Sequence, residues 1–486
     1  MTAERMRWLW LRALGGIFFS AFFSLYFQIE GLIGSRGLLP ARKYLEQVRV
    51  YAGAKRFWLA PTLLWLNASD AALQALVWIG LVASVAIVVN VWPRVAIAVA
   101  GIAFLSFIGA AQDFSAYQSD GMLLEAALLS IFFAPRGLRP GLAPEQPVNR
   151  GALFMLRWEW FRIYFESGLV KILSGETQWR DFTAMDKYYE NGPLPTWIGW
   201  YTQQRLPHSF HAATVAYTLL AELFVAWLAF LPKQSRRIAF AITTPLQIGI
   251  IITANYAFLN YLVLFLGVLL LAEPEKSPVP VAHKVVFTIL FVTTVFSFLA
   301  PSFPLVTLFE PFRVANRFGL FAVMTRERCE IEFQGSNDGE HWVAYPFRYK
   351  PQDPRKAPGI YAPYQPRFDW NLWFASLGDY TENAFVLNCE AQLLEASPPV
   401  LRLFAGNPFA AKPPAMVRAV KWQYWFTTPA ERARTGAWWN RKLIGLYAPP
   451  VSEAPPSAAA GPAASRRLGR GTRPRQPASR RRSEAS

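Results

Sequence analysis

The apolar stretch at residues 152–173 contains charged side chains at a spacing that could support chemistry. Glu159, Arg162 and Glu166 fall within about 60° of one another on a helix with 100° per residue, so they share one face. A charge at mid-membrane costs about 2.5–3.5 kcal/mol even on the lenient insertion scale. These three side chains therefore should face the interior of a helical bundle or a wet cavity.

Three roles are open for this charged face. It could be an ion-pair latch between helices, in which Arg162 pairs with either glutamate. It could also be a catalytic or proton-handling site, or part of a path for a polar substrate. Arg157 and Lys171 lie near the ends of the stretch, where long side chains can extend to the membrane interface. No catalytic residue is assigned, and the acid–base candidates are Glu159, Glu166, Lys171 and Asp181.

An irregular segment follows the charged stretch. Its two prolines and Gly192 prevent a continuous helix and favour an extended turn outside the membrane. The segment is either a functional loop or an ordered cap over the bundle. Its notable residues are Trp179, Arg180, Asp181, Tyr189, Glu190, Pro193 and Pro195.

The charged stretch belongs to a series of apolar runs that predict membrane-spanning helices. A helix needs about 20 apolar residues to cross the hydrocarbon. Met122–Ala134 is shorter and would span only with help from its flanks, or re-enter. Counting it gives about eight or nine spans within residues 1–301, with outer loops at 28–72 and 174–211. The other runs are Trp8–Phe27, Leu73–Val91, Val95–Ala111, Ala152–Leu173, Ala212–Leu231, Ile238–Ala254, Ala257–Ala272 and Val285–Ala300.

Positive charge near short loops predicts the orientation of these spans. With a cytoplasmic N-terminus, the inner loops carry Arg94, Arg136 and Lys233 among others, whereas the outer loops at 112–121 and 255–260 carry no lysine or arginine. Nine spans then place residues 302–486 outside the cytoplasm, in the periplasm or the ER lumen.

Residues 302–450 predict a small β-rich domain. Cys329–Phe333 and His341–Phe347 alternate in polarity, and Gly335–Gly339 between them supplies residues suited to a tight turn, so a β-hairpin is expected. The aromatic segments Asp369–Phe374 and Trp422–Phe426 could pack the core, anchor the domain at the membrane interface or form a surface for partner proteins.

Composition agrees with an α-helical polytopic membrane bundle followed by a small β-rich extracytoplasmic domain. The chain has 486 residues, of which 53% are hydrophobic and 17% charged, and this excludes a disordered chain or a small disulfide scaffold. Cys329 and Cys389 have no metal-ligand spacing, and they could pair only if both lie outside the cytoplasm and close together. Neither a metal nor a cofactor is indicated.

The net charge of +17 lies partly in a tail. Residues 451–486 are rich in Pro, Ala and Arg and are expected to be disordered, with eight arginines after residue 464. The tail could be solvated near anionic headgroups or bind an anionic partner. Because nucleic-acid binding would rest on this tail alone, no nucleic-acid partner is expected.

Several collinear blocks resemble the lipase maturation factor family. The central block is Phe161–Ile172, which continues through Trp179–Asp181 and Tyr189–Glu190 to Pro193–Pro195. This chain departs from the family at Tyr188, where a histidine is expected. The resemblance covers about residue 10 to Pro450. Further matching blocks are Gln118–Ala126, Asn255–Tyr261, Tyr345–Pro351, Arg367–Trp370 and Asn407–Phe409.

The resemblance implies a membrane factor that helps secreted lipases or related hydrolases reach an active fold, with the outer C-terminal region facing the client. Partners would be that client and membrane lipids. The high Ala, Arg and Pro content suggests a bacterial inner membrane with a periplasmic C-terminal domain, or the ER membrane with a lumenal one in a eukaryote. The implied client-facing candidates are Trp342, Tyr345, Arg367, Asp369, Trp370 and Trp373.

Features of the sequence distinguish between the competing functions. A non-enzymatic maturation factor is favoured, and no lipase activity is implied because the chain lacks a Gly-x-Ser-x-Gly elbow. The alternative is a membrane-embedded enzyme that uses the charged face of 152–173 on a lipid or protein substrate, since the bundle is also distantly similar to the vitamin K-dependent gamma-carboxylase group. A transporter is disfavoured by the lack of an internal repeat.

Overall fold

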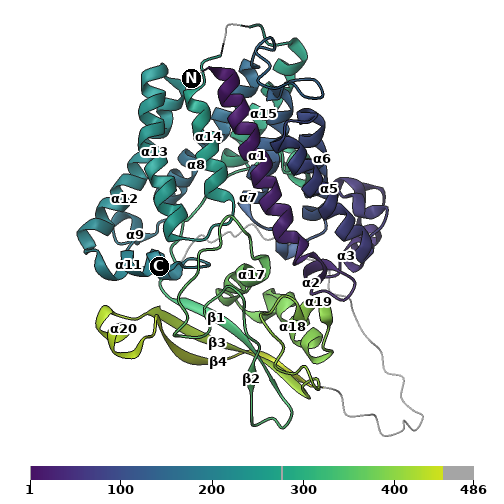
Figure 1. Cartoon of the computed structure of the whole chain (residues 1–486), viewed down its shortest axis with the longest axis vertical. Helices are drawn as coiled ribbons and strands as arrows, with labels where there is room; N and C mark the ends of the chain where they lie inside the picture. Colours follow the sequence, from purple (N-terminus) through teal and green to yellow (C-terminus); the bar gives the residue numbers. More distant parts are fainter. Residues whose placement is uncertain (1, 275–276, 453–486) are drawn as a thin grey trace. The chain divides into compact units, whose positions relative to one another are not determined.

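The first 300 residues fold almost entirely into helices, as the apolar runs predict (Figure 1). The computed structural model describes residues 2–274 and 277–452, and the chain up to Ser452 forms one compact unit. We call the helices before residue 302 the helical bundle and residues 302–452 the C-terminal region. The longer bundle helices are α1 (Ala3–Tyr26), α3 (Ala41–Ala52), α5 (Asp70–Val88), α6 (Pro93–Ile108), α7 (Gln118–Phe133), α8 (Arg150–Leu173), α12 (His208–Leu223), α13 (Lys233–Thr253), α14 (Leu259–Val268) and α15 (Val281–Leu299).

Four helices in the described residues are long and apolar enough to cross a membrane, which does not confirm the predicted eight or nine spans. They are Ala3–Tyr26, Asp70–Val88, His208–Phe230 and Val281–Leu299. The other predicted runs are helical too, but α6, α7 and α14 have 16, 16 and 10 residues. A single straight crossing needs about 20. α8 is long enough but contains the charged face.

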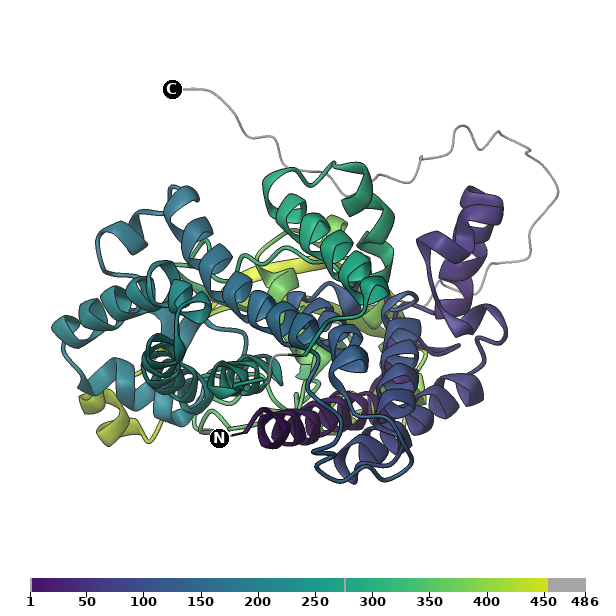
Figure 2. The same ribbon diagram turned by 90° about the horizontal axis from the view of Figure 1, so that it is seen from above.

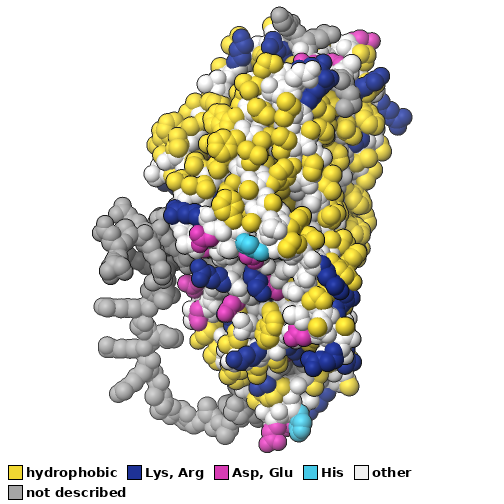
Figure 3. Space-filling model, turned by 90° about the vertical axis from the view of Figure 1, so that its left-hand side faces the viewer, with side chains coloured by type: hydrophobic (Ala, Val, Ile, Leu, Met, Phe, Trp, Pro, Cys, Tyr) yellow, Lys and Arg dark blue, Asp and Glu magenta, His cyan; other side chains and the backbone are white. Residues whose placement is uncertain are grey.

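The surface of the bundle is apolar. On the face in Figure 3, hydrophobic side chains cover a broad band, and charged side chains gather above and below it. Figure 2 shows the same bundle from above, where several of its helices run at a slant to the line of sight. A band of this kind suits the hydrocarbon core of a bilayer, where exposed apolar side chains carry no penalty.

The two predicted outer loops contain short helices. In loop 28–72, α2 (Ile29–Ile33) and α4 (Arg56–Leu59) flank α3. In loop 174–211, Pro193 and Pro195 follow the second of three helices, so the chain stays irregular there, as predicted. These three are α9 (Thr177–Arg180), α10 (Tyr188–Asn191) and α11 (Trp197–Arg205).

The C-terminal region contains one antiparallel sheet in the order β2-β1-β3-β4. The predicted hairpin is confirmed, because Gln334 pairs with Ala344 and Gly335 with Val343. Its second strand is much shorter than expected, since only two residues after the turn pair with β1. The strands are β1 (Arg328–Ser336), β2 (Val343–Ala344), β3 (Met416–Phe426) and β4 (Trp439–Ser452).

Helices pack on this sheet, so the region is less β-rich than predicted. The aromatic segment Asp369–Phe374 lies in a helix, and Trp370 and Trp373 are buried. Trp422–Phe426 forms the end of β3. Core packing is therefore the main use of these aromatic side chains. The helices are α16 (Pro304–Phe309), α17 (Arg367–Ser376), α18 (Ala384–Leu394), α19 (Pro398–Leu401) and α20 (Pro429–Thr435).

Two further expectations concern the end of the chain and the two cysteines. The predicted tail began at residue 451, but β4 extends to Ser452, and residues 453–486 lie outside the described part. Cys329 in β1 is half-buried, Cys389 in α18 is buried, and both are free thiols.

Close contact between α1 and α5 gives a test of the bundle. A Cβ at Gly80 would lie 2.3 Å from the ring of Phe22, which is itself held by Phe18 and Phe104. Gly80→Val should therefore lower the unfolding free energy by about 1–3 kcal/mol through overpacking, measured by thermal unfolding of the purified chain. Gly16→Val is the matched control, because nothing lies within 4 Å of a Cβ at that position. Equal midpoints for the two variants would contradict this packing.

Candidate functional site

The charged face of α8 contacts the segment that connects the bundle to the C-terminal region. Arg162 forms an ion pair with Glu125 of α7, and it donates a second hydrogen bond to the Asn316 carbonyl at 2.6 Å. The other Glu125 oxygen accepts from the Asn316 backbone N–H at 3.2 Å and from its side-chain amide at 3.1 Å. The prediction that Arg162 pairs with Glu159 or Glu166 is wrong, because the nearer partner comes from another helix.

The connecting segment makes further contacts with α8. The Phe318 N–H donates to Glu166 Oε2 at 2.6 Å, and the Leu320 N–H approaches Ser167 Oγ at 3.4 Å. Gly121 is required for this approach, since a Cβ there would lie 2.5 Å from Asn316 Oδ1. We call residues 313–321 the connector. Polar side chains of the bundle satisfy several of its backbone N–H groups, and two of these acceptors are the carboxylates of Glu125 and Glu166.

Glu159 differs from its two neighbours on the charged face. It is fully buried, and within the described residues neither of its carboxylate oxygens has a hydrogen-bond partner. A buried charge without a partner costs several kcal/mol, so a neutral, protonated Glu159 is the stable form inside the bundle. Glu159 is therefore the one member of the predicted cluster that no contact in the described structure explains.

Lys171 at the end of α8 does not extend to the membrane interface as predicted. It is buried, and its Nζ lies 2.8 Å from both carboxylate oxygens of Glu222 in α12. This ion pair borders a small cavity of about 60 Å³, which is also lined by Tyr164, Gln247 and Asn260. Gln247 bridges the other two, donating to Tyr164 Oη at 2.8 Å and accepting from Asn260 at 2.7 Å. The cavity has space for a few water molecules at most.

The loop after α8 is held by the C-terminal region. Arg328 of β1 donates to the carbonyls of Glu190 at 2.9 Å and Pro193 at 3.0 Å, and it pairs with Glu330. The sheet donates once more to the loop, because the Phe426 N–H of β3 donates to Glu190 Oε2 at 2.8 Å. Every one of these groups is buried, so the loop and the sheet satisfy each other's polar atoms.

The remaining loop residues divide into buried and exposed ones. Trp179 is buried and donates to the Phe321 carbonyl of the connector at 3.0 Å, and Pro195 forms an isolated β-bridge with Ala254. Tyr189 is also buried. Arg180 and Asp181, by contrast, are exposed at the end of α9, so the structure does not bring Asp181 into the buried cluster.

A second set of contacts joins the two parts of the chain near α17. Arg367 forms two 2.8 Å bonds with Asp120 of α7 and donates to the Phe114 carbonyl at 2.7 Å. Asn255 accepts from the Tyr361 N–H at 2.7 Å and donates to the Gly359 carbonyl at 2.9 Å. A bidentate arginine–carboxylate pair fixes orientation as well as distance, so α17 is locked onto α7.

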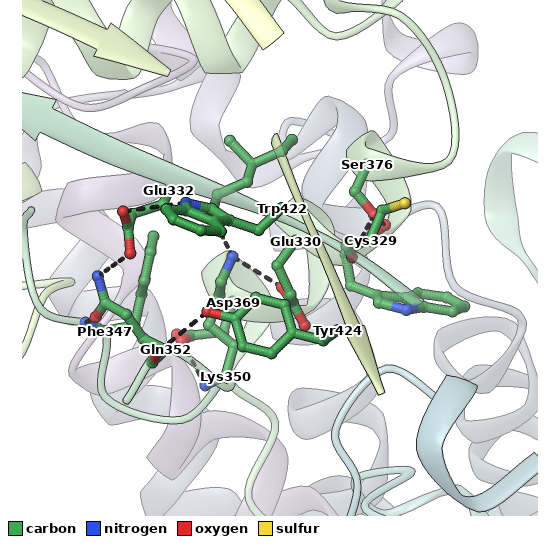
Figure 4. A network of polar contacts seen from close by, with 12 residues as sticks. Cys329, Glu330, Glu332, Phe347, Lys350, Gln352, Asp369, Ser376, Trp422 and Tyr424 are labelled. Carbon is green, nitrogen blue, oxygen red and sulfur yellow. Dashed lines mark hydrogen bonds and ion pairs between the residues drawn. The ribbon is translucent and has the colours of Figure 1, made fainter. Parts of the chain in front are cut away.

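Most of the implied client-facing residues are interior. Figure 4 shows Asp369 beside Lys350 and Glu330 beneath the sheet. Asp369 accepts from the Lys350 N–H at 3.1 Å, and burial raises its pKa to about 6. Tyr345, Arg367, Asp369, Trp370 and Trp373 are all buried. Trp342 is partly exposed, with the Arg418 guanidinium 4.0 Å from its ring centroid.

These contacts define the candidate functional site as the junction between the helical bundle and the C-terminal region. Among the residues that the structure describes, no group of three or more His, Cys, Asp or Glu side chains comes together to hold a metal ion. Glu166 and Lys171, two of the acid–base candidates, are occupied by structural partners. The arrangement therefore fixes one part of the chain against the other.

Sequence reasoning missed the partners from outside α8. Glu125 lies in the short apolar run Met122–Ala134, Asp120 lies just before that run, and Asn255 lies between two runs. An acid in an apolar helix needs a buried partner, and this signal could have identified both carboxylates. Arg328 and Asn316 carried no comparable signal, because a charged or amide side chain outside a span is ordinary in sequence.

Amide substitution of the two acids beside Arg162 should change the unfolding free energy by very different amounts. Glu125→Gln leaves the Arg162 charge without its counter-ion, so we expect a loss of about 3–5 kcal/mol in unfolding free energy. Glu159→Gln is the matched control, since it removes a carboxylate that has no partner, and we expect a change within about 1 kcal/mol. Denaturant unfolding of both purified variants measures the difference. A larger loss from Glu159→Gln would contradict the ion-pair assignment.

Comparison with known proteins identifies the family. The lipase maturation factor transmembrane domain matches residues 5–277, and the lipase maturation factor C-terminal domain matches residues 314–449. Lipase maturation factor 1 of Bos taurus is 32% identical over 91% of this chain and 88% of its own length. Lipase maturation factor 2 of Rattus norvegicus is 30% identical over 92% of this chain and 83% of its own length. No solved structure matches. The chain belongs to the lipase maturation factor family.

Proposed function

We propose that this integral membrane protein acts as a non-enzymatic folding or assembly factor for secreted lipases or related hydrolases. The relatives' names support a role in lipase maturation. The observation that carries the proposal is the use of the charged face of α8. Arg162 and Glu166 bind α7 and the connector rather than surrounding an open substrate cavity. The bundle then serves as a membrane platform for the C-terminal region.

The proposed topology follows the apolar band and the charge pattern. The bundle crosses the membrane about eight or nine times, with the shorter helices α6, α7 and α14 completing some of the crossings. The C-terminal region then lies in the periplasm of a bacterium, or in the ER lumen of a eukaryote. A secreted hydrolase folds in either compartment, so the C-terminal region would meet its client there.

The proposed client surface lies on the outer strands of the sheet. β4 is an edge strand, and Leu443, Ile444 and Leu446 on it are exposed. An apolar edge strand offers both unpaired backbone groups and side-chain contact area to an incompletely folded chain. Trp342 near β2 extends the same proposal to the other edge. The buried candidates, such as Arg367 and Trp370, would then act by holding this surface in place.

A membrane-embedded enzyme remains the second candidate, because Glu159 is buried without a partner. A protonated carboxylic acid in an apolar site is a suitable general acid. In that case Glu159 would be the essential group, and the substrate would be a lipid or protein segment that reaches the bundle interior.

The test is made in a host that lacks this gene, with the mass and the specific activity of each secreted lipase measured separately. If the protein is a maturation factor, the deletion host should secrete a normal mass of lipase. The activity per lipase molecule should fall by about tenfold or more, which corresponds to ~1.4 kcal/mol in the ratio of active to inactive molecules. The intact chain should restore it, and Glu159→Gln should restore it equally. If Glu159→Gln accumulates at the normal level yet restores nothing, the enzyme candidate replaces this proposal.

The client surface is tested in the same host. Leu443→Ser, Ile444→Ser and Leu446→Ser combined should leave the protein folded but fail to restore lipase activity. The control combines Val50→Ser and Leu66→Ser, two exposed apolar residues in loop 28–72. Full restoration by the β4 variant would exclude this surface without excluding a maturation role.

A further inference from the structure

A cavity of about 460 Å³ opens between the end of α1 and the C-terminal region. Phe23 of α1 and Phe27, which directly follows α1, form one side, and Tyr364 and Phe368 form part of the other. Arg348 and Arg402 also line it. The cavity thus combines aromatic walls with two guanidinium groups at the point where a membrane-spanning helix ends.

An aromatic ladder on α1 leads to this cavity. Phe19 stacks on Phe23 at 5.8 Å between ring centroids, Phe23 meets Phe27 at 5.2 Å, and Phe23 meets Tyr364 at 6.5 Å. Phe19, Phe23 and Phe27 are 40%, 43% and 54% exposed. Because α1 is long and apolar enough to span a membrane, these exposed rings would face lipid chains once it is inserted.

The charges in the cavity favour an anionic group. Arg348 is exposed and donates to the Arg402 carbonyl at 3.2 Å, but no ion pair satisfies it within the described residues. Arg402 pairs with Glu30, and its side chain is still 58% exposed. Asp369 also borders the cavity, where it accepts from the Tyr349 and Lys350 N–H groups. Arg348 is therefore the guanidinium of the lining that has no ion-pair partner among the described residues.

We propose that this cavity binds the headgroup of a membrane phospholipid. The phosphate contacts Arg348 and Arg402, and one acyl chain follows the Phe19, Phe23 and Phe27 ladder. Guanidinium groups bind phosphate oxygens through paired hydrogen bonds, and flat aromatic rings pack against an acyl chain. A water-soluble phosphate would use only the arginines and would leave the ladder unexplained. The bound lipid would brace α1 against the C-terminal region.

The test uses the full chain reconstituted into nanodiscs with equal amounts of phosphatidylethanolamine and phosphatidylglycerol, then transferred to a mild detergent. Native mass spectrometry should find one phospholipid retained per chain. Arg348→Gln should reduce that retained fraction at least about fivefold, because it removes this guanidinium from the cavity lining. Arg355→Gln is the control, since Arg355 is exposed in the same region and does not line the cavity.

A second variant separates the acyl contact from the charge. Phe27→Ser should also weaken retention, whereas an excess of inorganic phosphate should leave the lipid bound. Thermal unfolding shows whether each variant is folded. If Arg348→Gln does not fold, Phe27→Ser serves as the test. Equal retention by the folded variants and by Arg355→Gln would overturn the proposal. Displacement of the lipid by inorganic phosphate alone would overturn it too. Neither result depends on the lipase role.

Discussion

A guanidinium buried inside an apolar bundle is the constraint on which this structure depends. A guanidinium carries a positive charge and several hydrogen-bond donors, so Arg162 needs a carboxylate and further acceptors in the same interior. Glu125 supplies the charge, and the Asn316 carbonyl from beyond the last bundle helix supplies an acceptor. The bundle is thus incomplete without the connector. Once Asn316 is fixed there, Phe318 and Leu320 reach Glu166 and Ser167, and the position of the following sheet is set.

The same rule operates at two other points of the junction. Asp120 in the bundle is paired by Arg367 of α17, and the carbonyls around Glu190 are paired by Arg328 of β1. In each case one partner comes from the bundle side and the other from the C-terminal region, and both are buried. Separating the two parts would leave several buried polar groups unsatisfied, at roughly 1–3 kcal/mol for each neutral group and more for each charge. The proposed client surface on β4 and the proposed lipid site at Arg348 would both be held in place by this junction.

The sequence predicts a contact only where the two interacting residues lie close together in the chain. The helices, the hairpin at Gly335–Gly339 and the family likeness follow from periodicity, turn residues and collinear blocks, all of which lie close together in the chain. The shared face of Glu159, Arg162 and Glu166 also follows, because one helix determines it. The true partners do not follow, since Glu125 is 37 residues from Arg162 and Asp120 is 247 from Arg367. Single-sequence patterns likewise could not reveal that the aromatic segment Asp369–Phe374 lies in a helix, because buried aromatic runs suit either a helix or a strand.

A double-mutant cycle between Asp120 and Arg367 tests most directly the claim that the bundle and the C-terminal region fold as one unit. Unfolding free energies are measured in detergent for the wild type, Asp120→Asn, Arg367→Gln and the double variant. Each single change should be costly, and the double change should cost less than their sum, by a coupling of about 2–4 kcal/mol. Additive losses, with a coupling below about 0.5 kcal/mol, would mean that the two parts do not depend on this contact and would contradict the account.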